Sequence, residues 1–292
     1  LTRRDTIVVA SVSCIYGLGS PEHYEGQLLV LEVGHEVDHR ATLGRLIDMQ
    51  YERNDMVLER GRFRVKGDTL EIHPAYEKTA FRISLFGDLV EAITEVDTLT
   101  GDHIRQLDEL VVFPATHYMA DAPNIRRAIV GIEAELADRL AVFEADGRLL
   151  EAQRLRMRTE YDLEMLAELG YCNGVENYSM HLDGRSYGDR PYTLLDYFPD
   201  DFLVVLDESH VAVPQLHGQH AGDRSRKKTL VEHGFRLPSA ADNRPLTFEE
   251  FTGRVGQVLF LSATPGAWEL EASSRVVEQI VRPTGLIDPE VM

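Results

Sequence analysis

The chain is poor in cysteine and has no long apolar run, and each shortage excludes a class of protein. Its two cysteines in 292 residues, Cys14 and Cys172, are too few for a disulfide framework and lack the spacing of a metal site. No stretch approaches the roughly 18 apolar residues of a membrane span, and none has the pattern of a secretory signal. We therefore expect a cytoplasmic protein with no membrane partner.

Basic residues are also scarce, at 30 Lys and Arg against 49 Asp and Glu, for a net charge of −19. Neutralisation of phosphates is the main sequence-independent contribution to nucleic-acid binding. The composition therefore excludes a protein that coats nucleic acid through its overall charge. A DNA-acting protein of this kind needs a local basic patch, inserted apolar groups or a partner that loads it. The densest basic run, Arg224–Lys228, is a candidate patch and equally well the solvated start of a helix.

Two short apolar runs end in polar tetrads. Phe202–Leu206 precedes Asp207–His210, and Val258–Leu261 precedes Ser262–Pro265. Such runs are typical of strands buried on both faces of a parallel sheet, and open α/β sheets bind ligands beyond the carboxyl ends of these strands. The pattern predicts two parallel strands with a ligand site at their shared end. The alternative is two buried strands followed by ordinary polar loops.

The strand prediction carries two expectations about exposure. The apolar positions should be almost completely buried, and the acidic pair Asp207 and Glu208 should open onto a cleft. One carboxylate placed there can hold a metal-bound nucleotide, while the next orients or activates the attacking water. The apolar positions concerned are Val204, Val205, Leu259 and Leu261.

Both tetrads resemble boxes of superfamily 2 helicase motors, the first the Walker B box and the second the Ser-Ala-Thr box. Longer segments resemble signature segments of the UvrB family, the excinuclease B subunits of bacterial nucleotide excision repair. These segments are Ile7–Gly19, Tyr192–Pro199, Gly234–Ala240 and Asp242–Leu246. The resemblance runs through essentially the whole chain. It implies a RecA-like α/β domain of the P-loop NTPase type with a parallel sheet.

A phosphate-binding loop of the form Gly-x-x-x-x-Gly-Lys-Ser/Thr is missing, and the chain opens at Leu1 without an initiator Met. A motor with a Walker B box and no phosphate loop is incomplete. We therefore expect an internal fragment. Its nucleotide-binding lysine and the family's aromatic hairpin would lie upstream of Leu1. A second motor domain with the arginine that completes the ATP site would lie beyond Met292.

Periodicity changes along the chain. Residues 6–10 form a strand-like run, and from about residue 25 to 118 short alternating segments predict a compact α+β unit. Arg62–Val65 and Thr69–His73 predict a hairpin, and alternation from Phe81 to Val96 continues the sheet. His39–Gln50 predicts one helix. From Pro123 to Gly170 the period becomes helical, with a break at Asp146-Gly147, which predicts a helical hairpin.

Together with the resemblance, these patterns predict a motor domain that is interrupted by an α+β insert and a helical subdomain and then resumes. The insert is implied to bind UvrA, the damage sensor of the same repair system. The predicted divisions are motor domain 1–23, α+β insert 24–118, helical subdomain 119–193, resumed motor domain 194–285 and the start of a linker 286–292.

The resemblance also implies roles for the tetrads, with ATP and Mg²⁺ as cofactors. Asp207 would hold the nucleotide's Mg²⁺ through water, and Glu208 would position and polarise the water that attacks the γ-phosphate. Ser262 and Thr264 would couple the nucleotide state to DNA contacts by bonding to the Walker B turn. His210 could join that network or be a satisfied polar side chain.

Candidate DNA contacts lie just beyond the first strand-like run. Ser11, Ser13 and Tyr16 are placed where such motors touch the nucleic-acid backbone, and hydroxyls can position phosphates without reading sequence. An ordinary turn of small residues is the alternative. Arg158 is a further possible phosphate contact, although a solvated helix face explains it equally well.

Three basic residues of the insert are candidate partner contacts. In the UvrB family, arginines in segments matching those around Arg53 and Arg64 contribute to binding UvrA. Lys66 departs from that pattern, because a point charge replaces a bidentate fork. The alternative is three exposed charges on a hairpin. If they form a partner-facing patch, neutralising Arg64 and Lys66 together should weaken association with UvrA and leave folding nearly unchanged, since exposed ion pairs contribute only about 0–1 kcal/mol.

Three functions remain open. The first is an ATP-driven motor that verifies damaged double-stranded DNA, loaded by UvrA and recruiting the nuclease UvrC. The second is another superfamily 2 translocase, which would not be expected to match the segments around Tyr192 and Phe235. The third is a fragment that only binds a partner protein. Tight nucleotide binding by the isolated chain would exclude the third, and we expect none.

Overall fold

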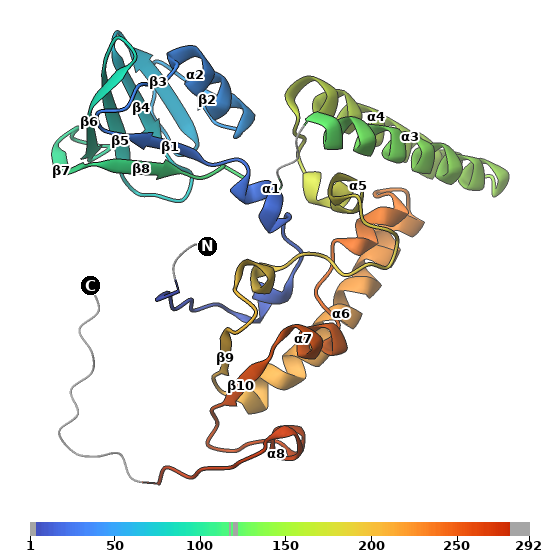
Figure 1. The fold of residues 1–292 in the computed structure, drawn as a ribbon. Helices are drawn as coiled ribbons and strands as arrows, with labels where there is room; N and C mark the ends of the chain where they lie inside the picture. The colour runs from blue at the N-terminus through green and yellow to red at the C-terminus, as the bar shows by residue number, and fades with distance from the viewer. Residues whose placement is uncertain (1–3, 117, 119–121, 281–292) are drawn as a thin grey trace.

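The computed structural model describes residues 4–116, 118 and 122–280. Figure 1 shows a sheet-rich part, a long helical hairpin, and a mixed part in orange and red that packs with the N-terminal segment. Within the described residues, no helix is both long and apolar enough to cross a membrane. The chain therefore has the mixed α/β character that its sequence patterns predicted.

The sheet-rich part is a six-stranded sheet with strand order β2-β3-β4-β5-β6-β7. Neighbouring strands are antiparallel except for the short β2, which runs parallel to β3. Helix α2 and a separate antiparallel pair, β1 with β8, share the apolar core of this sheet. The bounds are β1 Leu29–Glu32, α2 His39–Asp48, β2 Glu52–Arg53, β3 Arg62–Lys66, β4 Thr69–His73, β5 Ala80–Phe86, β6 Leu89–Val96, β7 His103–Leu107 and β8 Glu109–Val112.

Alternation along the strands explains this sheet. Phe63 and Ile72 lie opposite each other in the β3–β4 hairpin and are fully buried, because alternate residues of a strand face the same side. Gly67 makes the tight turn with a φ of +59°, a left-handed conformation that glycine adopts without strain. The predicted hairpin, the alternating strands that follow it and the helix near His39–Gln50 are confirmed.

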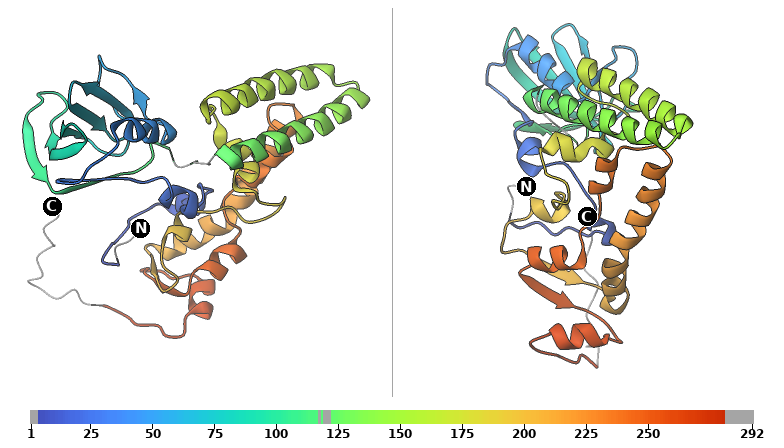
Figure 2. Two further views of the ribbon diagram at one scale, coloured as in Figure 1. Left: turned by 45° about the horizontal axis from the view of Figure 1, so that its top comes forward. Right: turned by 90° about the vertical axis from the view of Figure 1, so that its right-hand side faces the viewer.

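The helical hairpin consists of α3 (Ala122–Ala145) and α4 (Leu149–Leu169), which break at the predicted Asp146-Gly147. Their apolar stripes form one core, which includes Ile132, Leu136, Leu140, Phe143, Leu155, Leu163 and Leu166. A short turn η2 (Val175–Tyr178) and helix α5 (Ser179–Asp183) follow. Near its turn the hairpin contacts the end of α6 (Figure 2), where Arg154 donates to the His233 carbonyl at 2.8 Å.

The mixed part contains two parallel strands, β9 (Leu203–Leu206) and β10 (Gln257–Phe260), paired residue for residue along their length. The predicted parallel orientation is confirmed. An apolar cluster that includes Ile15, Leu216 and Phe251 packs against one face of the pair. The remaining elements are η1 Val12–Ile15, α1 Pro21–Glu25, η3 Leu194–Tyr197, α6 Ser209–Glu232, η4 Pro238–Asp242, α7 Phe248–Arg254 and α8 Ala267–Ala272.

The near-complete burial predicted for the two strands is wrong. Val205 and Leu259 are 48% and 47% exposed, Leu261 is 43% exposed, and Val204 is half buried. Val204 and Leu206 contact the apolar cluster, while the alternate residues face away from it. An apolar run in the sequence does not reveal which part of a protein covers the second face of a strand, and the described residues cover only one.

The strand expected at residues 6–10 is also not formed. These residues have no strand partner among the described residues, and Ile7 and Val9 are 92% and 95% exposed. β-Propensity reflects packing against neighbouring strands, so a β-prone run without a paired backbone stays irregular.

Candidate functional site

The ends of β9 and β10 place the two polar tetrads side by side. The backbone ladder continues past the strands, since the Leu261 N–H donates to the Leu206 carbonyl at 3.0 Å. The Ser209 N–H then donates to the Leu261 carbonyl, also at 3.0 Å. The start of α6 is thereby held against the segment that follows β10.

A side-chain link joins the same two segments. The Ser262 hydroxyl lies 2.8 Å from Nδ1 of His210, and it also accepts the N–H of Thr264 at 3.0 Å. His210 Nδ1 lies 3.5 Å from a carboxylate oxygen of Glu208. The structure therefore brings the predicted residues Asp207, Glu208, His210, Ser262 and Thr264 to one end of the strand pair.

Glu208 has an unusual backbone conformation. Its φ of +46° and ψ of +50° lie in the left-handed region. Among the described non-glycine residues, only Gln50 also has a positive φ. Such conformations persist only where the surroundings hold them, and they cluster at functional sites. Asp207 accepts the N–H of Glu208 at 3.0 Å through its side chain, and both carboxylates are exposed.

Ser209 anchors the turn that carries Glu208. It is fully buried, and its hydroxyl donates to Oε1 of Glu269 at 3.0 Å. Desolvation opposes ionisation of Glu269, but hydrogen bonds from the backbone at Gly266 and from Ser209 outweigh it and lower the pKa of this carboxyl. Sequence reasoning missed Glu269, because no motif distinguishes it from Glu271 in the same short helix.

Ser11, Ser13 and Tyr16 lie together at η1, where they line a hollow of about 280 Å³. The hydroxyls of Ser11 and Ser13 are 2.5 Å apart, and the Tyr16 hydroxyl donates to Asp223 on α6 at 2.6 Å. Burial and the bond to Asp223 raise the pKa of Tyr16 far above its usual range, so its phenol is neutral. Three of the four predicted DNA contacts thus share one surface.

Part of the basic run on α6 pairs with Asp223, the residue that accepts the Tyr16 hydroxyl. Arg226 and Lys227 both pair with Asp223, at 3.1 Å and 3.0 Å. Lys227 is buried, and its ammonium also donates to the Asn243 carbonyl. Two charges of the predicted electrostatic patch are therefore engaged within the protein.

Arg158, the fourth predicted DNA contact, lies in α4 of the helical hairpin, whereas the other three lie at η1. Its guanidinium bonds Oδ2 of Asp162 at 2.8 Å and the Asn173 carbonyl at 2.6 Å. Asp162 is buried and also accepts the Tyr178 hydroxyl at 2.8 Å. These contacts give Arg158 a structural role at the base of the hairpin.

The three basic residues of the insert differ in environment. Arg53 pairs with the half-exposed Asp55 at 3.1 Å, and Lys66 is exposed. Arg64 instead bonds Glu71 at 2.5 Å, and the Glu71 side chain is only 6% exposed. Arg64 is therefore not one of three exposed charges, and the expectation of unchanged folding loses its basis at this residue, because the β3–β4 register places it opposite a buried carboxylate.

Glu71 is shared between two arginines. Arg82 on β5 lies on its other side, and the shortest contact is 2.9 Å. Desolvation of Glu71 opposes its ionisation, but the hydrogen bonds from Arg64 and then Arg82 outweigh it and hold the pKa below its ordinary value. The triad forms one charged cluster on the polar side of the sheet.

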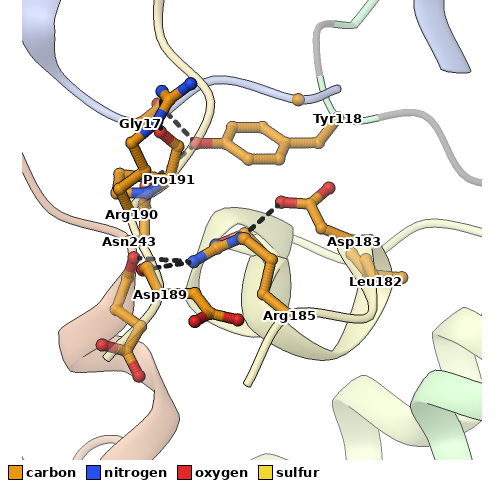
Figure 3. A network of polar contacts seen from close by, with 12 residues as sticks. Gly17, Tyr118, Leu182, Asp183, Arg185, Asp189, Arg190, Pro191 and Asn243 are labelled. Atoms are coloured by element: carbon orange, nitrogen blue, oxygen red, sulfur yellow. Dashed lines mark hydrogen bonds and ion pairs between the residues drawn. The ribbon is translucent and has the colours of Figure 1, made fainter. Parts of the chain in front are cut away.

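A polar junction connects the insert to the mixed part (Figure 3). The Tyr118 hydroxyl, at the exit of the insert, donates to the Gly17 carbonyl at 2.6 Å and lies 3.0 Å from Oδ1 of Asn243. Beside it, Arg185 and Asp183 form an ion pair at 3.1 Å whose side chains are only 8% and 4% exposed. Sequence reasoning missed this junction, since its members come from four distant segments.

The sheet-rich insert and the helical hairpin each match a domain of a known protein family. Residues 29–118 match the UvrB interaction domain, and residues 123–184 match the UvrB third helical domain. Over all 292 residues the chain is 61% identical to UvrABC system protein B of Streptomyces coelicolor. The chain belongs to the UvrB family. This confirms the resemblance drawn from its signature segments.

Other relatives agree on the family. Identity is 60% to UvrABC system protein B of Thermobifida fusca and 59% to that of Mycobacterium tuberculosis, each over the whole of this chain. The chain spans about two fifths of the length of these curated relatives, 42% and 41% respectively.

Proposed function

We propose that the chain forms part of the ATP-driven, helicase-like subunit of a bacterial excision-repair nuclease, with a RecA-like fold in its mixed part. The observation that carries this proposal is the parallel, in-register β9–β10 pair, whose ends hold an acidic pair beside a Ser-x-Thr segment. The relatives' shared name, UvrABC system protein B, supports the excision-repair role.

The acidic pair suits a nucleotide held with Mg²⁺. Carboxylate oxygens are the ligands that Mg²⁺ prefers, and it is usually bound by one or two carboxylates together with phosphates and water. Asp207 would hold the ion through water, with the nucleotide's phosphates as the other ligands. The bound ion would neutralise charge that develops on the phosphates.

Glu208 would orient the attacking water and accept its proton. Its carboxylate is exposed and reaches one bond further than that of Asp207, so the two can serve different atoms. Ser262 and His210 would pass changes at this end of the strands to the segment after β10, because they join the two tetrads directly.

The loop at η1 would hold the DNA backbone through Ser11, Ser13 and Tyr16. The hydroxyls of Ser11 and Ser13 at the hollow fit phosphate contacts that carry no sequence information, while Tyr16, whose hydroxyl donates to Asp223, would fix the loop in place. The overall acidity of the chain favours loading by a partner over capture of DNA by charge, and damaged double-stranded DNA is the substrate that the family implies.

The insert would bind UvrA, and the assembled complex would recruit UvrC. The match to a UvrB interaction domain over residues 29–118 supports this role. Arg53 and Lys66 are exposed enough to meet a partner directly, whereas Arg64 would act together with Glu71. A role limited to partner binding remains a second function, favoured by the same match.

The test is Glu208→Gln in the intact protein. The amide keeps the size of the side chain but cannot accept a proton at neutral pH, so nucleotide affinity should be unchanged while turnover falls at least about 100-fold. ATP binding is measured by titration calorimetry and turnover by phosphate release. Turnover at the wild-type rate would contradict the assignment, and absence of both binding and turnover in the wild-type protein would favour the partner-binding function.

A further inference from the structure

Two features of the strand ends are not explained by the proposed chemistry. Glu208 is held in a left-handed backbone conformation, and the residue that follows it, Ser209, is completely buried although it carries a hydroxyl. Both point to a contact that fixes this turn.

Ser209 is fixed through two of its groups. Its N–H donates to the Leu261 carbonyl at 3.0 Å, which any residue could do. Its hydroxyl donates to Oε1 of Glu269 at 3.0 Å, which requires a side chain of this type. Because Ser209 directly follows Glu208, fixing its position also restricts the backbone torsions of Glu208.

Glu269 is itself held firmly. The residue is 3% exposed, on the short helix α8 that follows the Ser262–Pro265 segment. Its other carboxylate oxygen lies so close to Gly266 that a Cβ there would come within 2.5 Å of it. The carboxylate therefore occupies the space that a side chain at residue 266 would need.

We propose that Glu269 is a positioning residue for Glu208, acting through the hydroxyl of Ser209. The proposal rests on the ATPase function proposed above, because it assigns Glu208 to the attacking water. It adds a second side-chain connection from the Asp207–His210 tetrad to the chain that follows β10, separate from the Ser262–His210 contact. A shift of the segment between β10 and α8 changes the orientation of Glu208 through this connection.

The first test is a double-mutant cycle in the intact protein, using Ser209→Ala and Glu269→Ala. Each variant should lower kcat for ATP about tenfold with little change in KM, because the bond serves the chemical step and not binding. The double variant should lose no more than either single one, since both remove the same contact. Glu271→Ala, an exposed change on the same helix, is the matched control and should retain wild-type kcat.

Two further variants separate positioning from folding. Glu269→Gln keeps an oxygen that can accept the Ser209 hydroxyl, so it should recover most of the lost kcat. Gly266→Ala leaves both partners in the chain but displaces the carboxylate, so it should reproduce the loss. Melting temperatures identify any variant that simply fails to fold.

Hydrogen exchange of the peptide spanning 207–211 gives a readout that requires no nucleotide. Exchange of the Ser209 amide should accelerate about tenfold in Glu269→Ala and Ser209→Ala and remain at the wild-type rate in Glu271→Ala. Additive losses of kcat, or unchanged exchange with unchanged kcat, would overturn the proposal. If Glu208→Gln also retains turnover, the proposed ATPase assignment fails instead, so the two failures are distinguishable.

Discussion

Removing Arg64 should destabilise the insert rather than simply alter its surface. Arg64→Ala takes away one of two guanidiniums from Glu71, whose side chain is 6% exposed. Loss of one partner of a buried ion pair costs about 3–5 kcal/mol. Because Arg82 remains on the other side of Glu71 and Arg64 is itself 21% exposed, we expect the unfolding free energy of the insert to fall by about 2 kcal/mol.

Hydrogen exchange in β3, β4 and β5 is the suitable assay for this loss. The chain has a single tryptophan, Trp268, which lies in α8, so its fluorescence does not report on the insert. Opening free energies from exchange should fall by about 2 kcal/mol in Arg64→Ala. Lys66→Ala, an exposed change on the same strand, is the matched control and should stay within about 0.5 kcal/mol of the wild type.

The pH dependence gives the same prediction a second check. The pKa of Glu71 is lowered from 4.5 in the folded protein, so its ionisation contributes stability that is present above pH 4.5 and is lost as the pH falls through the folded-state value. The difference in unfolding free energy between the wild type and Arg64→Ala should therefore have its full value at pH 7 and become smaller below pH 4.5. This reasoning would be refuted if Arg64→Ala is as stable as Lys66→Ala, or if the difference in unfolding free energy between Arg64→Ala and the wild type stays the same in acid.

Three other substitutions have expected outcomes. Arg158→Ala should destabilise the helical hairpin by about 2 kcal/mol, because buried Asp162 loses an ion-pair partner. The salt dependence of DNA binding should not change; if the slope of log binding constant against log salt concentration falls in magnitude by about 0.9, Arg158 contacts a phosphate instead. Gly17→Ala should cost about 1–3 kcal/mol in thermal unfolding, because its Cβ would overlap the side chain of Asn243. Gly234→Ala should cost at least about 2 kcal/mol in the same assay, since its φ is +68° and its Cβ would meet the backbone of α4; a loss below about 0.5 kcal/mol would contradict this.

The sequence predicted those elements whose pattern is local. Alternation across the β3–β4 hairpin and the helical period on either side of Gly147 follow from residues near each other in the chain. The parallel orientation of β9 and β10, which are far apart in the sequence, was predicted from the apolar pattern within each strand. The family could also be inferred, because its signature segments are long and contiguous.

Features that depend on distant segments could not be predicted in this way. The pairing of Arg64 with Glu71 depends on strand register, and the bond from Ser209 to Glu269 joins residues 60 apart. Burial of β9 and β10 was overestimated, because an apolar run indicates a preference for covered faces but not what covers them. Contacts of this kind become visible only in the folded structure.

Incision of damaged DNA tests the proposed function most directly. The intact protein is mixed with UvrA, UvrC, ATP and a duplex carrying a single lesion, and the wild type is compared with Glu208→Gln. We expect the wild type to support incision, and the variant to associate with UvrA on the lesion but support at least about 100-fold less incision, because turnover of ATP is lost. Incision by the variant at the wild-type rate, or none by the wild type, would contradict the assignment of Glu208 and of the chain to an ATP-driven repair subunit.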